Sequence, residues 1–387
     1  MQKMLCIGFL VNPIAGMGGS VGLKGTDGDL VIEAVRRGAK PVSPNRARRF
    51  LRALLRYDHR IRVVAANNMM GCDYLKEVQY PSYSCIPIPE NRETTPEDTV
   101  KAAKTFTEEG VDLVVFVGGD GTARDIAQAV DKRVPILGIP SGVKMYSGVF
   151  ASSPEAAAAV IARFAESRSV DVAEVADADE EAIAKGLLRV RVFTYVLAPD
   201  VPGLVIPSKD FGGYGGESEE KEAIAEYFVS ELMRKDILYL LGPGSTVKAI
   251  TDLLGQPKTL LGFDAMINGE VIGMDLGEKG ILELLSRHRN AVAVITVIGR
   301  QGYLIGRGNQ QLTPRVLRTI GGKRGILPIA TPTKLRGLKY ALVDTGDPAL
   351  DKEMSGFYRF VTGFKEETIV RVLPASDPEL LSRLAAQ

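Results

Sequence analysis

Residues 112–122 have the sequence DLVVFVGGDGT, in which an unbroken apolar run passes directly into a glycine-rich turn with one carboxylate, Asp120. A continuous apolar run of this length predicts a strand of a parallel sheet that is buried on both faces. Apolar runs at 4–11, 61–65 and 134–139 alternate with helical stretches at 44–57, 96–109 and 123–130, with Thr95 as the expected N-cap of the second helix. The alternation predicts an α/β domain with a parallel, Rossmann-like sheet and helices on both faces.

The turn at residues 118–122 has the composition of a phosphate cradle. Ligands of open parallel sheets bind beyond the carboxyl ends of the strands, and glycines there let backbone N–H groups approach phosphate oxygens. A carboxylate in such a cradle repels phosphate, which favours Asp120 holding Mg²⁺ or accepting a proton from an attacking hydroxyl. A tight strand–helix turn, with Asp120 as an N-cap and no ligand, explains the same residues.

A second glycine-rich loop follows the first predicted strand, from Asn12-Pro13 through Gly28. We expect it to face the turn at 118–122 across a crevice. It matches neither the dinucleotide fingerprint nor the P-loop, because no helix opens at Gly19 and Lys24 is not followed by Ser or Thr. The phosphate contacts expected from this loop are Asn12, Gly16, Gly18, Gly19 and Lys24.

The composition restricts the class of protein. At 387 residues the chain is long enough for two domains, and 48 Lys and Arg against 47 Asp and Glu give a net charge of +1. Because the charges nearly cancel, the protein has no broad positive electrostatic potential that would attract nucleic acid or hold the protein stably at an anionic membrane. We expect a cytoplasmic protein whose three cysteines (Cys6, Cys72 and Cys85) are reduced thiols, with Cys6 buried in a strand.

The pattern changes after about residue 169. Alternating residues at 188–197 predict an antiparallel strand, and further strands are expected at 237–241, 260–267, 291–298, 338–343 and 367–373. We therefore predict an α/β phosphate-cradle domain over residues 1–165 and a β-rich substrate-binding domain over 166–387, with the last helix able to pack back on the first domain.

Three motifs in this order resemble one superfamily. Residues 118–122 resemble the GGDGT signature of NAD kinases and diacylglycerol- or sphingosine-type lipid kinases, and Asn12-Pro13 with Gly16 is similar to the lipid-kinase N-P-x-[SA]-G loop. Asp236, the strand after it and Gly244-Ser245-Thr246 resemble the NAD kinase stretch ending in T-P-T-G-S-T-A-Y. Residues 22–28 are similar to a divergent ATP-NAD kinase-like (acetoin-catabolism X-like) branch, and the chain is identified as a member of it.

The resemblance implies a two-domain fold with the active site between the domains, and Mg²⁺-dependent transfer of the ATP γ-phosphoryl group to a hydroxyl. In NAD kinases that hydroxyl is the 2′-OH of the adenosine ribose of NAD, and the product is NADP. Asp120 would be the base or metal-organising carboxylate, and relatives commonly form homo-oligomers through the C-terminal domain. By the same resemblance, diphosphate would be held by Gly118, Gly119, Gly121 and Thr122, and the dinucleotide pocket would be lined by Gly244, Ser245 and Thr246.

The departures from the family pattern leave alternatives open. Ala123-Arg124-Asp125 replaces the lipid-kinase x-N-E. Either Asp125 keeps an acidic catalytic role and Arg124 meets a phosphate, or both residues lie on the solvated face of the helix. Lys144 is a candidate phosphate contact or a surface lysine, and residues 331–334 (TPTK) approach a phosphate or form a plain turn. The acceptor is NAD, or another small-molecule or lipid hydroxyl; a third reading is a catalytically inactive nucleotide-binding regulator. The donor is ATP or polyphosphate.

Overall fold

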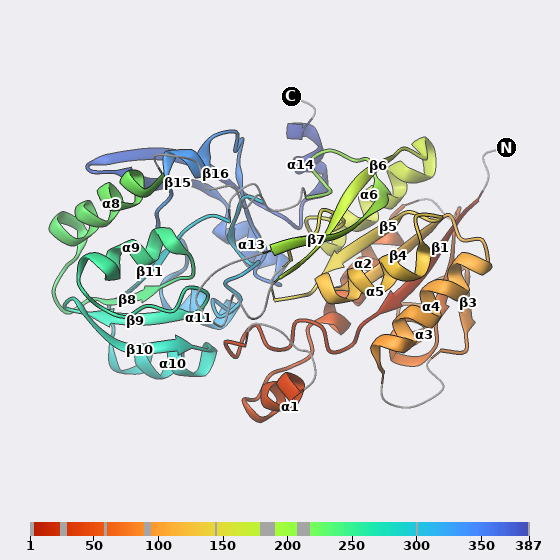
Figure 1. Cartoon of the computed structure of the whole chain (residues 1–387), viewed down its shortest axis with the longest axis horizontal. Helices are drawn as coiled ribbons and strands as arrows, with labels where there is room; N and C mark the ends of the chain where they lie inside the picture. The colour runs from red at the N-terminus through yellow and green to blue at the C-terminus, as the bar shows by residue number, and fades with distance from the viewer. Residues whose placement is uncertain are drawn as a thin grey trace. The chain divides into compact units, whose positions relative to one another are not determined.

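The structure is a computed structural model of the chain, shown in Figure 1. It describes residues 4–23, 29–57, 60–88, 94–143, 145–178, 190–206, 217–298 and 301–385. The chain divides into two compact units: the first comprises Met1–Met17, Lys40–Lys209 and Ala375–Gln387, and the second comprises Gly18–Ala39 and Asp210–Pro374. Each unit is described by itself below.

The first unit contains a five-stranded sheet in the order β3-β2-β1-β4-β5, in which every neighbouring pair is parallel. All residues of β4 and β5 are buried, as the unbroken apolar runs predicted. The predicted parallel α/β domain is therefore confirmed. The strands are β1 (Leu5–Val11), β2 (Ile61–Ala66), β3 (Tyr83–Ile86), β4 (Leu113–Gly118) and β5 (Ile136–Pro140).

Helices cover both faces of this sheet. On one face α2 (Ser43–Leu54) packs against α6 (Pro154–Ser167), and on the other α4 (Pro96–Glu108) packs against α5 (Asp120–Val130). Phe9 of β1 stacks on Phe50 of α2 with 5.5 Å between ring centroids. On the opposite side of the same strand, Gly8 leaves room for a ring of α4, since a Cβ there would lie 2.6 Å from Phe106 Cγ. Two shorter helices complete this part of the unit: η1 (Asn68–Met70) and α3 (Cys72–Glu77).

Two helix starts test the sequence predictions. Thr95 caps α4 in a capping box with Asp98, as expected from the sequence. The helix expected at 123–130 begins three residues earlier, at Asp120, because the extended backbone of Gly119 serves as its N-cap. The GGDGT motif is therefore partly a turn and partly the first turn of α5.

The antiparallel ribbon of β6 (Val170–Ala178) and β7 (Val190–Pro199) belongs to the first unit, because both strands pack on α5. The last helix, α14 (Pro378–Ala385), packs on α6 of the same unit. The first unit thus extends to Lys209 and regains the C-terminal residues, in contrast to the predicted division at residue 165. Alternating polar and apolar residues predict a strand with one buried face, but they do not indicate which domain's core that face covers. The predicted and observed boundaries differ for this reason.

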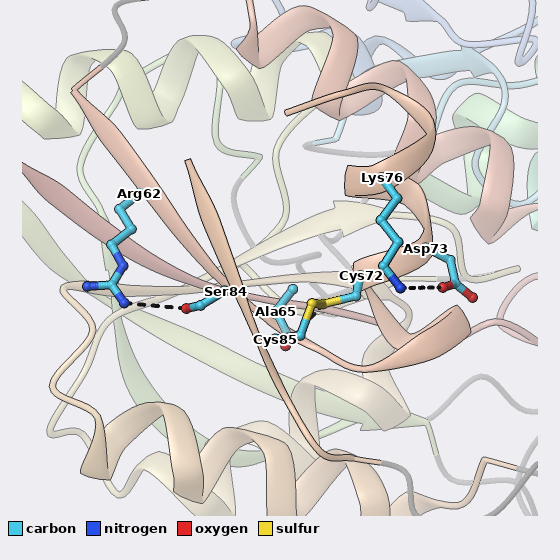
Figure 2. Close-up of a disulfide and its surroundings, with 7 residues drawn as sticks. All are labelled: Arg62, Ala65, Cys72, Asp73, Lys76, Ser84 and Cys85. Carbon is cyan, nitrogen blue, oxygen red and sulfur yellow. Dashed lines mark hydrogen bonds and ion pairs between the residues drawn. A yellow bond between two sulfur atoms is a disulfide. The ribbon is translucent and has the colours of Figure 1, made fainter. Parts of the chain in front are cut away.

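Figure 2 shows that Cys72 and Cys85 form a disulfide, so the prediction of three reduced thiols is wrong. Cys72 is the first residue of α3 and Cys85 lies on the edge strand β3, with Cα atoms 6.1 Å apart. The spacing of 13 residues carries no disulfide signature, and only the packing of α3 beside β3 brings the sulfurs together. Cys6 is not part of this disulfide and is half-buried on β1.

The second unit holds two sheets, which confirms a β-rich C-terminal domain. One has the order β10-β9-β8-β11-β13, in which β8, β11 and β13 are parallel and β9 and β10 antiparallel; the other has the order β12-β14-β16-β15. The strands are β8 (Leu238–Leu241), β9 (Phe263–Ile267), β10 (Glu270–Leu276), β11 (Ala291–Ile295), β12 (Tyr303–Ile305), β13 (Ile326–Pro328), β14 (Ala341–Val343), β15 (Gly356–Gly363) and β16 (Glu366–Pro374).

The helices of the second unit are mostly short. Among the residues that the structure describes, none of the helices in either unit combines the length and apolarity that crossing a membrane requires. The helices of this unit are α1 (Asp29–Arg36), α8 (Glu217–Tyr227), its π-helical continuation η2 (Phe228–Leu232), α9 (Ser245–Leu253), α10 (Glu278–Arg287), α11 (Pro314–Thr319), η3 (Gly322–Gly325), α12 (Pro332–Leu335) and α13 (Pro348–Met354).

Candidate active site

The strand order of the first sheet reverses between β1 and β4, and this switch point is where open α/β sheets bind ligands, beyond the carboxyl ends of the strands. Asn12 follows β1 and the GGDGT motif follows β4, so both predicted loops begin at this point. The two are joined: Asn12 Nδ2 donates to Thr122 Oγ1 at 3.0 Å, and Asn12 N donates to Val117 O at 2.9 Å.

The first two glycines of the motif lie in close contact with their surroundings. A Cβ at Gly118 would lie 2.6 Å from the Thr122 side chain, and one at Gly119 would lie 3.1 Å from Gly142 Cα. Gly142 belongs to the loop after β5, and the N–H groups of Ser141 and Gly142 both donate to Gly118 O. The motif is therefore held against the end of a third strand, and these two glycines fulfil a structural role.

Gly121 differs from its neighbours. It lies in the first turn of α5 with no positive φ, and no described atom outside its own helix backbone lies within 4 Å of the position of an added Cβ. The fold therefore gives no reason for a glycine here, where alanine favours a helix by about 1 kcal/mol. An open position at a helix N-terminus beside the switch point leaves space for a phosphate oxygen to approach the backbone.

The Asp120 carboxylate is buried, with 8% of the residue exposed, and it is bound within the protein. Its Oδ2 accepts from Tyr146 N at 2.6 Å, and its Oδ1 accepts from Ser147 N at 3.0 Å and from Ser147 Oγ at 2.6 Å. Burial and the neighbouring Asp120 charge raise the pKa of the Tyr146 hydroxyl. At least three of the carboxylate's roughly four acceptor positions are thus occupied in this conformation.

The other predicted residues of the first unit are placed as follows. Asp125 lies one turn into α5, where its carboxylate is 3.7 Å from Arg124 Nε and its side chain is 18% exposed, against 40% for Arg124. Arg124 is thus on the solvated face, and Asp125 is turned inward. Lys24 and Lys144 lie outside the described residues.

Gly16 is fixed by a close approach to the loop after β5. Its φ is +81°, and a Cβ there would overlap the carbonyl oxygen of Ser141. Ser43 spans the same contact, since its hydroxyl donates to Ala15 O at 3.0 Å and lies 2.9 Å from Ser141 Oγ. The sequence contained no spacing signal for Ser43, which lies 98 residues from Ser141.

Gly18 and Gly19, also predicted to hold phosphate, belong to the second unit. A Cβ at Gly19 would lie 3.2 Å from Gln310 Cβ, and Ser20 O accepts from Glu278 N at 2.7 Å. Within the first unit, Asn12 of this loop contacts the GGDGT motif through Thr122. The second half of the loop packs on the start of α10.

The Gly242–Thr246 loop of the second unit follows β8. Gly244 has a φ of +114°, and its N–H donates to Leu260 O at 2.8 Å. This amide is therefore already satisfied, unlike the phosphate-binding amide expected there. Thr246 is fully buried, while Ser245 is exposed at the start of α9.

A buried ion pair supports this loop. Lys258 Nζ lies 2.9 Å from Asp264 Oδ2, with neither side chain exposed, and also donates to Thr259 O and Gly262 O. Asp264 also accepts from Thr259 N and Asp275 N. Burial lowers the pKa of the Lys258 ammonium, and Asp264 acts in the opposite direction. The pair fixes residues 258–262, which contact Gly244.

Comparison with known families gives two matches. Residues 7–169 match the ATP-NAD kinase N-terminal domain, and residues 235–372 match the ATP-NAD kinase C-terminal domain, so the two matches together cover most of the chain. No curated protein and no solved structure matches the chain. Because both domain types occur in order, the chain belongs to the ATP-NAD kinase family, within the NAD kinase and diacylglycerol kinase-like superfamily, and is a kinase-type enzyme.

Proposed function

We propose that the protein is an NAD kinase, which transfers the γ-phosphoryl group of ATP to the 2′-hydroxyl of the adenosine ribose of NAD and releases ADP and NADP. The family supports the reaction class, and the observation that carries the site is the open position at Gly121. The fold does not require a glycine at position 121. In this proposal Gly121 lacks a side chain because a ligand phosphate lies over the first turn of α5.

In this proposal the N–H groups of the first turn of α5 bind the phosphates and orient the donor. Phosphoryl transfer depends mainly on positioning and on charge neutralisation, so few side chains are needed. Asp120 accepts the proton of the incoming hydroxyl once one of its donors at residues 146–147 turns away. The same donors hold the carboxylate in a defined orientation before the substrate arrives.

Magnesium fits this site as an ion that enters with ATP and neutralises phosphate charge. In the part of the chain that the structure describes, no group of three or more His, Cys, Asp or Glu side chains is arranged to hold a metal ion. Mg²⁺ bound to a nucleotide needs only one or two carboxylates in addition to phosphates and water. Asp120 and the inward-turned Asp125, both on α5, are the residues that would supply them.

The test is to incubate the purified full-length chain with Mg-ATP and NAD, and to quantify NADP with an NADP-specific dehydrogenase alongside ADP. We expect equimolar NADP and ADP. ADP formed only with another alcohol from an acceptor panel would contradict NAD as the acceptor while keeping the reaction class.

A nucleotide-binding regulator without catalysis is the second candidate, because Asp120 is already engaged by three donors. ATP binding without ADP formation for any acceptor would favour it over the kinase.

A further inference from the structure

The disulfide of the first unit has one buried and one exposed half. Figure 2 shows it joining the start of α3 to β3. Cys72, the first residue of α3, is 0% exposed, whereas Cys85 is an exposed residue of β3. Thiol–disulfide exchange begins when a thiolate attacks one of the two sulfur atoms, and it depends on access to that sulfur. A thiolate from solvent therefore attacks at Cys85, and Cys72 is the cysteine that leaves.

The strand that carries Cys85 is held by few other contacts. β3 has four residues and lies at the edge of its sheet, where it pairs with β2. Its buried residue, Ile86, packs in the core. α3 has stronger anchors, because Leu75 is fully buried and Arg48 Nε donates to both carboxylate oxygens of Glu77. Segments with few buried contacts open at the lowest free energy, so the bond matters most for β3 and for the residues next to Cys72.

The start of α3 lies against the strand that leads to the candidate active site. Gly71 directly precedes Cys72 and approaches β1 closely, because a Cβ added there would lie 3.0 Å from Phe9 O. β1 continues into Asn12, whose side chain donates to Thr122 of the GGDGT motif. The disulfide thus fixes a turn that packs on β1 shortly before the first residue of the site.

A second contact connects the same turn to the segment that holds Asp120. Met70 is 1% exposed and belongs to the core cluster that also contains Met145. Met145 directly precedes Tyr146, whose N–H donates to Asp120 Oδ2 at 2.6 Å. Movement of the turn therefore changes the packing beside the residue that orients the carboxylate.

We propose that Cys72 and Cys85 form a redox switch, in which Cys85 exchanges with thiols in solution and Cys72 is the resolving cysteine. In the oxidised form the bond fixes the turn before α3 against β1, and the site binds nucleotide tightly. In the reduced form β3 and this turn loosen, and the nucleotide affinity falls. Only the choice of ATP as the nucleotide rests on the proposed function.

The reductant of this switch is a dithiol. One of its thiolates attacks the Cys85 sulfur, the bond to Cys72 breaks, and Cys72 leaves as a thiolate that takes up a proton. The second thiol of the reductant, as a thiolate, attacks its own partner sulfur in the mixed disulfide and releases Cys85, which is also protonated. The protein gains two electrons and two protons, and the dithiol becomes a disulfide. A disulfide oxidant reverses the same steps.

The first measurement compares the two cysteines one at a time. Cys72→Ser leaves Cys85, Cys85→Ser leaves Cys72, and each variant is mixed with oxidised glutathione while peptide mass mapping follows the mixed disulfide. We expect Cys85 to react at least about tenfold faster than Cys72, because exchange follows access. Equal rates, or a faster reaction of Cys72, would overturn the switch.

A wild-type experiment covers the case in which either single variant does not fold. The oxidised chain is treated briefly with limiting reduced glutathione and quenched with acid, and the trapped mixed disulfide is located by mass. We expect it on Cys85, since that is the sulfur under attack. A mixed disulfide on Cys72 would overturn the switch.

The second measurement is the ATP affinity of the full-length chain by isothermal titration calorimetry, before reduction and after dithiothreitol has been applied and removed. We expect reduction to weaken ATP binding by about fivefold or more, in the usual range for coupled sites, and reoxidation to restore it. Cys6→Ser keeps the disulfide and is the matched control, which should respond as the wild type does. The Cys72→Ser, Cys85→Ser double variant should not respond to reductant. Affinities of the oxidised and reduced wild type within about twofold of each other would overturn the switch.

Hydrogen exchange distinguishes a local switch from a general loss of structure. We expect reduction to speed amide exchange in residues 68–77 and 83–88, while β1, β4 and β5 stay protected. Loss of protection throughout the first unit would overturn the switch, because the bond would then support the whole fold. The glutathione reaction and the hydrogen exchange need neither ATP nor turnover. Absence of NAD phosphorylation would therefore contradict the proposed function and leave these results standing.

Discussion

The hydroxyl of Ser147 donates a 2.6 Å hydrogen bond to Oδ1 of Asp120, and so joins the segment after β5 to the first residue of α5. The same hydroxyl oxygen accepts from Ala176 N of β6 at 3.0 Å. The carboxylate at the centre of the GGDGT motif is therefore held by a segment that also contacts the ribbon of the first unit. Substitutions of Ser147 and of Asp120 therefore distinguish the structural role of the Asp120 carboxylate from its chemical role.

We predict that Asp120→Asn lowers the free energy of unfolding by about 1–3 kcal/mol, because an amide nitrogen cannot accept from a buried donor. Turnover falls at least about a hundredfold, as expected for the loss of a general base. Urea unfolding and the kcat for phosphoryl transfer measure the two effects. Ser147→Ala is the control, because it removes a donor and keeps the carboxylate: we expect about 1 kcal/mol of destabilisation and little change in kcat. Wild-type turnover in Asp120→Asn would exclude Asp120 from the chemistry.

Gly121→Ala and Gly16→Ala should have opposite effects on the stability of the chain. At Gly121 a methyl group meets no described atom outside its own helix backbone, so the variant keeps its stability or gains up to about 1 kcal/mol, while ATP affinity falls through contact with the phosphate. At Gly16 a methyl group overlaps the Ser141 carbonyl in a left-handed backbone, and the chain is destabilised by more than about 1 kcal/mol. Thermal unfolding and ATP titration test both; unchanged ATP affinity in Gly121→Ala would remove the phosphate from this turn.

The buried pair of Lys258 and Asp264 should be sensitive to the loss of one partner. Lys258→Met leaves an uncompensated buried carboxylate, and we expect about 3–5 kcal/mol of destabilisation by urea unfolding. The exposed pair of Lys248 and Asp252 provides the control, with less than about 1 kcal/mol for Lys248→Met. Equal effects of the two substitutions would show that burial does not determine the strength of the first pair.

The disulfide between Cys72 and Cys85 can be detected by counting free thiols, and its contribution to the stability of the chain can be measured. Titration of thiols in the denatured chain should give one thiol before reduction, from Cys6, and three afterwards. Reduction should lower the stability by about 3 kcal/mol, the usual value for a closed loop of this size, and the Cys72→Ala, Cys85→Ser double variant should no longer respond to reductant. Three thiols in the unreduced chain would contradict the disulfide.

Tyr80 predicts how stability depends on alkaline pH. Burial raises the pKa of its hydroxyl from 10.0 to about 12, so above pH 10 the unfolded chain loses a proton that the folded chain retains. The folded state then binds more protons, and the free energy of unfolding falls as the pH rises from 10 to 12. Tyr80→Phe should remove about 2 kcal/mol of this decline at most. Identical pH profiles for the two proteins in urea unfolding would contradict this assignment.

The sequence by itself predicted the elements whose signals are local. The apolar runs of β1, β4 and β5 indicated buried parallel strands because a strand covered on both faces can tolerate few polar residues. Thr95 predicted the start of α4 because a cap and its helix are neighbours in the chain. The GGDGT motif was predicted at the end of a strand for the same reason, and the structure confirms that position.

Only the tertiary structure decided which residues those elements bring together. The partners of Asp120 lie 26 and 27 residues away, Lys334 donates to Thr246 from 88 residues away, and the disulfide joins a helix to an edge strand. Gly18 and Gly19 continue the same loop as Gly16 but pack in the second unit. Spacing along a chain encodes burial and backbone conformation within a few residues, whereas these contacts depend on the order in which strands assemble into a sheet, and that order is set by the packing of the whole core.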